Sequence, residues 1–190
     1  RRHDREQAIK AVELCKEYGI TNISIDLIYG LPNQTQQAWE ENLRQAIRLD
    51  VPHLSAYHLI YEEGTALYKL MEAGKVPPIN EELSVSFFST LIDRLAEAGY
   101  LHYEISNFAR PGFFSKHNSS YWTGKKYLGL GPSAHSYNGI DREWNPSSLP
   151  IYIEGIENGH PTIESEDLDL CTRYNDFIIT GLRTMWGVSF

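Results

Sequence analysis

Asp26 is the first residue whose type and position suggest chemistry. It is a carboxylate inside the apolar run Ile23–Tyr29 (ISIDLIY), which has the composition of a strand buried on both faces. Charged side chains are rarely buried without a partner, and α/β proteins bind ligands at the carboxyl ends of their strands. The position therefore predicts either a ligand-binding carboxylate or an aspartate that is tied to a neighbouring loop.

Lys116–Trp122 (KHNSSYW) is the second segment with candidate chemistry. It contains His117, followed by the large aromatic residues Tyr121 and Trp122. Imidazole is a good ligand for haem iron, and aromatic rings can cover a flat apolar ligand. The alternative is an ordinary surface histidine beside two residues that anchor the core. Glycines flank the segment on both sides, so we expect it to be a flexible loop.

Three other segments contain candidate groups. Gly129–Ser136 (GLGPSAHS) has neither the Gly-Lys-Ser/Thr ending of a Walker A loop nor a G-x-G-x-x-G spacing. It is either a tight turn or a loop that contacts a ligand. Glu62 and Glu63 are adjacent, and because neighbouring side chains of a loop usually diverge, we do not expect a catalytic pair. Glu104 is expected either to be tied to the backbone or to face a pocket.

The elements that would position these groups follow an α-β-α-β order. An amphipathic helix is predicted over Arg5–Tyr18. Thr35 caps a helix that joins two apolar strands, Ile23–Tyr29 and His53–Ile60, and this order predicts a parallel βαβ unit. Beyond residue 100 we expect short strands and loops. Other helices are predicted over 66–73, 80–98 and 150–158, and a last one is expected to begin after a cap at Ser165.

Composition and charge exclude several classes of protein. The 190 residues carry a net charge of −8, which argues against nonspecific binding of nucleic acid, because such binding needs clustered Lys and Arg. No apolar run is long enough to cross a bilayer, and no secretory leader is visible. Cys15 and Cys171 are expected to be buried free thiols in a reducing, cytoplasmic compartment. Because the chain begins with Arg1 and not with Met, we expect a piece of a longer protein.

Four motifs together resemble the family of oxygen-independent coproporphyrinogen III oxidases, which are radical S-adenosylmethionine (SAM) proteins. They are IDLIYGLPNQT, HLSAYHLI with EEGT after it, GYLHYEISNFARPG and YLGLGPSAHSY. The resemblance implies an α/β fold. Residues 1–100 would form the last β/α units of a partial (β/α)6 radical SAM barrel. Residues 101–190 would form a small α+β accessory region that leads into a truncated C-terminal domain.

The same resemblance implies cofactors and site residues. The Cys-x-x-x-Cys-x-x-Cys loop that holds the [4Fe–4S] cluster in this family is absent from the chain, so no cluster ligand and no catalytic residue are predicted within it. HNSSYW matches the HNxxYW motif of the family's haem-chaperone branch. The residues implied in SAM binding are Arg1, Asp26, Ile28, Ile60 and His135, and those implied in haem binding are His117, Tyr121 and Trp122.

Two functions from different classes follow from the resemblance. One is a haem-binding chaperone that delivers haem to membrane-bound acceptor proteins and uses SAM and the cluster as cofactors. The other is an enzyme that oxidatively decarboxylates two propionates of coproporphyrinogen III. The HNxxYW match favours the chaperone. We expect the 190 residues alone, without the cluster loop, to be inactive.

Overall fold

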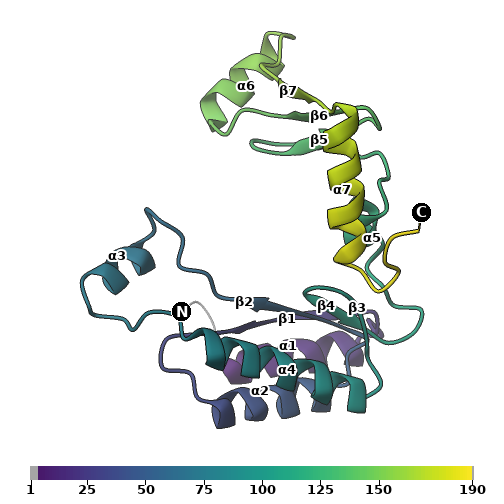
Figure 1. The fold of residues 1–190 in the computed structure, drawn as a ribbon. Coiled ribbons are helices and arrows are strands. Elements are labelled where there is room, and N and C mark those ends of the chain that lie inside the picture. Colours follow the sequence, from purple (N-terminus) through teal and green to yellow (C-terminus); the bar gives the residue numbers. More distant parts are fainter. Residues whose placement is uncertain (1–3, 190) are drawn as a thin grey trace. The chain divides into compact units, whose positions relative to one another are not determined.

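The computed structural model describes residues 4–189 of the chain, so Arg1 lies outside the described residues. These residues form two compact units, which divide between Phe114 and Ser115. Figure 1 shows the elements of each unit. No helix of the described part is long and apolar enough to span a bilayer.

The first unit is a four-stranded sheet covered by helices on one face (Figure 1). Its strands lie in the order β1-β2-β4-β3. The strands β1 and β2 are parallel, and the other two pairings are antiparallel. The strands are β1 (Ser24–Tyr29), β2 (His53–His58), β3 (Leu101–Glu104) and β4 (Asn107–Ala109), and the helices are α1 (Arg5–Glu17), α2 (Gln36–Arg48), α3 (Ala66–Glu72) and α4 (Glu81–Glu97). The predicted parallel βαβ unit is confirmed as β1-α2-β2.

Local capping explains where the helices of this unit begin. The Thr35 hydroxyl oxygen accepts a hydrogen bond from the Ala38 amide at 3.2 Å, and Asn80 does the same for the Leu83 amide at 2.9 Å. Such side chains satisfy amides that the first turn of a helix leaves without partners. The Thr35 cap was predicted from the sequence, as was a helix that begins near residue 80.

The core lies between the sheet and helices α1, α2 and α4. Trp39 of α2 is completely buried, and its indole N–H donates to the carbonyl oxygen of Phe87 in α4 at 2.9 Å. This bond ties the two helices together beneath the sheet and satisfies the one polar atom of a large buried ring. The other core side chains include Val12, Leu43, Ala46, Leu54, Leu91, Leu95 and Phe108.

The prediction that the first strand, β1, is buried on both faces is wrong. The helices cover one face of the sheet, and within residues 4–189 the other face of β1 is left open (Figure 1). Side chains alternate between the faces of a strand. Ser24, Asp26 and Ile28 are therefore exposed, whereas Ile25, Leu27 and Tyr29 are partly or fully buried. The continuous apolar run reflects Ile28, an apolar residue on the open face.

The first unit extends past residue 100, where a boundary was expected from the sequence. The strands β3 and β4 join the same sheet, and Leu54 of β2 pairs with Phe108 of β4. The Tyr100 hydroxyl also donates to the carbonyl oxygen of Val51 at 2.5 Å. Pairing across about 50 residues of sequence cannot be read from local composition, which changes near residue 100.

The second unit combines a three-stranded antiparallel sheet, in the order β5-β6-β7, with three helices. The expected short strands and the helix near residues 150–158 are present. The elements are α5 (Lys116–Trp122), β5 (His135–Tyr137), β6 (Asp141–Trp144), α6 (Leu149–Glu157), β7 (Glu164–Asp167) and α7 (Leu170–Leu182).

Three local predictions in this unit are wrong. Ser165 does not cap the last helix, because it belongs to β7 and pairs with Glu143 of β6; the Asp169 side chain caps α7 instead. The segment with His117 is not a flexible loop, since it forms α5, whose first turn is capped by Ser115. Cys171 is exposed, not buried.

Candidate functional site

A row of polar side chains crosses the face of the first sheet that carries Asp26. Asp26 pairs with Ser55, Ser55 pairs with Asn107, and Asn107 pairs with Glu104. Directly paired residues project from the same face of a sheet. The four side chains, here called the polar row, therefore run from β1 through β2 and β4 to β3.

The polar row is exposed at one end and buried at the other. Asp26 is exposed, whereas Glu104 and Asn107 are 3% and 4% exposed. The Glu104 carboxylate accepts hydrogen bonds from the Asn107 side-chain amide and, at 3.3 Å, from the Ser106 backbone N–H. Of the two alternatives for Glu104, the structure therefore favours a carboxylate tied to its own turn.

Asp26 is open to a ligand. Among the described residues its side chain makes no hydrogen bond or ion pair, so the alternative of an aspartate tied to a loop is not observed. Ile28, two residues further along the same face, is 51% exposed. Ile60 is 66% exposed and lies two residues beyond the end of β2. The first unit thus places these three residues of the implied SAM set on or next to one sheet.

His53 lies next to Asp26 on this face and was not predicted as a site residue from the sequence. Its Nδ1 lies 2.7 Å from the Ser24 hydroxyl oxygen and its Nε2 lies 2.8 Å from the Tyr103 hydroxyl oxygen. Burial lowers the pKa of His53, and the Asp26 carboxylate opposes this shift. The imidazole is therefore neutral at pH 7. It contacts the exposed Ser24 hydroxyl through one ring nitrogen and the buried Tyr103 hydroxyl through the other.

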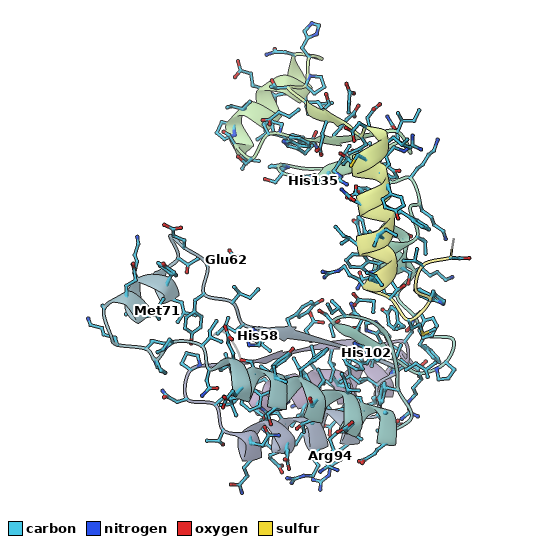
Figure 2. The ribbon with its side chains drawn as sticks, viewed as in Figure 1. His58, Glu62, Met71, Arg94, His102 and His135 are labelled. Atoms are coloured by element: carbon cyan, nitrogen blue, oxygen red, sulfur yellow. The ribbon has the colours of Figure 1, made fainter. Side chains whose placement is uncertain are left out.

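The turn after β1 is fixed at the carboxyl ends of the parallel strands. Gly30 has a φ of +76°, and a Cβ at this position would lie 2.7 Å from Nε2 of His58. His58, labelled at the end of β2 in Figure 2, also contacts the Ser84 hydroxyl at 2.9 Å. The Gly30 amide donates to the Gln34 side chain at 2.8 Å. These contacts hold the turn in place at the end of the sheet where ligands bind in α/β proteins.

His135, the last member of the implied SAM set, lies in the second unit. It is exposed on β5 (Figure 2), and its ring centroid lies 5.6 Å from that of Trp144. The loop before it is held by its own contacts. The Gly131 amide donates to the Tyr152 hydroxyl at 3.1 Å, and the Asn145 side-chain amide donates to the carbonyl oxygen of Gly131 at 2.9 Å. These bonds favour the tight turn over a ligand-contact loop.

The second unit contains a cavity of about 690 Å³ that is rich in aromatic lining residues, here called the aromatic cavity. Its walls come from the end of α5, from β5 and β6, from one side of α7 and from the segment after α7. The aromatic lining residues are Tyr121, Trp122, Tyr127, Tyr137, Tyr174, Phe177 and Trp186. Pockets for small molecules typically have volumes of about 300–1,000 Å³ and mostly apolar walls.

The HNSSYW segment adjoins this cavity through its last two residues. Tyr121 and Trp122 line the cavity, whereas His117 is not one of the lining residues. His117 is exposed one turn earlier, and its Nε2 lies 3.3 Å from the Tyr121 hydroxyl oxygen. The helix α5 therefore brings together the three residues of the implied haem set. His117 and Tyr121 lie one turn apart on the same side of the helix, and Trp122 follows Tyr121 directly.

The two arginines that line the cavity differ in their salt-bridge partners. The Arg142 guanidinium lies 2.6 Å from Asp176 and 3.5 Å from Glu166, so two carboxylates balance its charge. Arg173 also lines the cavity, but it makes no salt bridge within residues 4–189. Burial raises the pKa of the Tyr127 hydroxyl, and the nearby Arg142 opposes this shift. The cavity thus combines aromatic side chains with a cation, Arg173, that makes no salt bridge within residues 4–189.

No group of three or more His, Cys, Asp or Glu side chains within the described residues is arranged to hold a metal ion. Glu62 and Glu63 are both exposed in the turn before α3. His53, Asn107 and Arg173 were not predicted from the sequence. The alternation of Ser24-Asp26 and His53-Ser55 along two paired strands is a signal that could have revealed the polar face, whereas Arg173 has no local signal.

Comparisons with known proteins show what the chain is similar to. The chain is 35% identical to "Heme chaperone HemW" of Bacillus subtilis over 188 residues, which cover 98% of this chain and 50% of that protein. It is 36% identical to the HemW of Synechocystis sp. over 194 residues, covering 100% of this chain and 46% of that protein. The chain spans about half the length of the curated relatives it matches. No protein-family model matches it.

A solved structure shows the same fold. Coproporphyrinogen III oxidase (HemN) from Escherichia coli, described as a radical SAM enzyme, matches with a TM-score of 0.77 at 22% sequence identity, over 96% of this chain and 45% of that one. The fold is therefore that of part of a radical SAM protein. By its sequence the chain is similar to the HemW haem chaperones, at 34–35% identity over nearly its whole length. The resemblance predicted from the motifs is confirmed.

Proposed function

We propose that the protein is a HemW-like, haem-binding chaperone of the radical SAM family. The observation that carries this proposal is the HNSSYW helix, where Tyr121 and Trp122 line an aromatic cavity and His117 contacts Tyr121. Haem is a flat, largely apolar molecule whose iron takes imidazole as an axial ligand. The iron would bind Nε2 of His117 in place of the weak contact with the Tyr121 hydroxyl.

The first unit would bind SAM on its open face. A carboxylate such as Asp26 accepts charge-assisted hydrogen bonds from an ammonium or hydroxyl group, and Ile28 offers apolar contact beside it. Ile60 belongs to the same proposed set, whereas Arg1 and His135 are assigned to SAM by the family resemblance alone. The [4Fe–4S] cluster would be held by cysteines outside residues 4–189, and when bound it would supply the electron that radical SAM chemistry requires.

The whole protein would pass haem to acceptor proteins in the membrane. The alternative, oxidation of coproporphyrinogen III, shares the fold but requires turnover of that substrate. Anaerobic incubation of the reduced, cluster-loaded complete protein with SAM and coproporphyrinogen III distinguishes the two. We expect no decarboxylated product, and formation of that product would overturn the chaperone proposal.

Haem titration of the complete protein, followed at the Soret band, tests the ligand directly. We expect His117→Ala to shift the Soret maximum and to weaken haem binding, because an axial bond to iron is lost. His160→Ala removes an exposed histidine from the turn after α6 and serves as the matched control. If His117→Ala and His160→Ala both bind haem with the parent's spectrum and affinity, His117 is not the ligand.

A further inference from the structure

Arg173 is a cation in an aromatic site with no anion of its own. We propose that the aromatic cavity holds the porphyrin ring and that Arg173 pairs with one of its propionates. This inference rests on the proposed haem-binding function and extends it from His117 to the walls of the cavity. It assigns a binding role to α7, which carries none of the residues predicted from the sequence.

The side of α7 that faces the cavity is built for a flat ligand. Leu170, Tyr174 and Phe177 follow i, i+4, i+7 spacing, so they form one stripe along the helix. All three line the cavity, and they are 83%, 56% and 49% exposed. Large aromatic side chains that remain half-exposed around a hollow offer faces against which a planar ring can stack.

The opposite wall is a continuous series of tyrosine rings. The rings of Tyr121 and Tyr127 lie 4.7 Å apart, and those of Tyr127 and Tyr137 lie 6.1 Å apart. Backbone hydrogen bonds in both directions between Tyr127 and Tyr137, at 3.0 and 2.9 Å, fix this series to the sheet. The wall is therefore held in place before a ligand arrives, which lowers the entropic cost of binding.

The charges select an anionic ligand. Three charged residues line the cavity, namely Arg142, Arg173 and Asp176. The charges of these three lining residues sum to +1, and Arg173 is the one that makes no salt bridge within residues 4–189, because Asp176 is held by Arg142. Guanidinium groups bind carboxylates through two parallel hydrogen bonds. A planar ring that carries carboxylates at its edge satisfies both the walls and this cation.

The cavity and His117 make separable contributions. His117 lies outside the cavity, and Tyr121 is shared, because its ring lines the cavity while its hydroxyl contacts the imidazole. The cavity should therefore bind a porphyrin that has no iron. An iron-free ring cannot use His117 as an axial ligand, so it reports on the walls and on Arg173 alone.

Fluorescence titration of the complete protein with iron-free protoporphyrin IX and with its dimethyl ester tests this inference. We expect the parent to bind the free acid about tenfold more tightly than the ester, a difference of about 1.4 kcal/mol. Arg173→Leu should weaken binding of the acid to the level of the ester and leave the ester unchanged. Arg173→Lys should restore part of the preference, since it keeps the charge but not the planar fork.

Two further variants separate charge from shape. Tyr174→Ala should weaken binding of the acid and of the ester equally, because it removes an aromatic ring that lines the cavity and leaves the charges unchanged. Lys125→Leu removes an exposed cation of the same unit that does not line the cavity, and it should change neither affinity. Circular dichroism confirms that each variant is folded before its titration is interpreted.

The outcomes distinguish this inference from the proposed function. If Arg173→Leu weakens the acid and the ester equally, or neither, the propionate assignment is overturned. If His117→Ala leaves haem binding unchanged while the acid–ester preference depends on Arg173, the axial ligand is wrong and the cavity assignment stands. A complete protein that binds neither haem nor protoporphyrin overturns both.

Discussion

Gly30→Ala should destabilise the first unit more than the same change at a glycine with open surroundings. Gly30 has a φ of +76°, and a methyl group there would lie 2.7 Å from Nε2 of His58. Gly64 has a φ of +83°, and a methyl group at that position would meet no other atom within 4 Å, so it is the matched control. Each substitution imposes the left-handed backbone on alanine, which costs about 1–2 kcal/mol.

The additional cost at Gly30 comes from His58. The imidazole must move away from the new methyl group, and this breaks its 2.9 Å contact with the Ser84 hydroxyl. A hydrogen bond of this kind contributes about 0.5–1.5 kcal/mol. We therefore expect Gly30→Ala to lower the free energy of unfolding by about 1 kcal/mol more than Gly64→Ala does.

Urea unfolding followed by tryptophan fluorescence measures this difference, because Trp39 is the only tryptophan of the first unit. In a His58→Ala background the steric term disappears, and the two glycine substitutions should then cost the same. Equal losses in the parent background would refute the reasoning, and so would an unchanged difference in the His58→Ala background.

Two other predictions concern the open face of the sheet. Asp26→Ala in the complete protein should weaken SAM binding by about 1.5–3 kcal/mol, the value of a hydrogen bond to a charged group; calorimetry that shows unchanged affinity would contradict the proposed role. The pKa of His53 is lowered in the folded state, so below pH ~6.5 the unfolded chain takes up the proton first and stability falls as the pH drops. His53→Gln should flatten this dependence between pH 7 and pH 5 in urea titrations, and an unaltered slope would assign it to other groups.

The parts of the fold that depend on neighbouring residues were predictable from the sequence. Thr35 and Asn80 cap helices by accepting hydrogen bonds from amides three residues away, so the local sequence is enough to predict these caps. The parallel pairing of β1 and β2 follows from the helix between them. HNSSYW could be recognised as a motif, although its Ser115 cap, which makes the segment a helix, was overlooked.

The features that the sequence did not reveal depend on distant partners. Which face of β1 is covered depends on where three helices pack, and Ile28 gives no sign of its exposure. Ser165 and Asp169 are both good caps, and only the pairing of β7 with β6 decides between them. Arg173 becomes a candidate because Asp176 and Glu166 are occupied by Arg142, and this competition exists only in the folded chain.

Within residues 4–189, β1 lies at the edge of its sheet, and this position links strand pairing to ligand binding. A strand that paired with β1 would place every second side chain on the face that carries Asp26 and Ile28. The same strand thus offers backbone groups for pairing at its edge and side chains for ligand binding on its face. A ligand that contacted both β1 and the added strand would stabilise their pairing by RT ln(1 + [L]/Kd), so the free energy of strand pairing would grow with the logarithm of the ligand concentration once that concentration exceeds Kd.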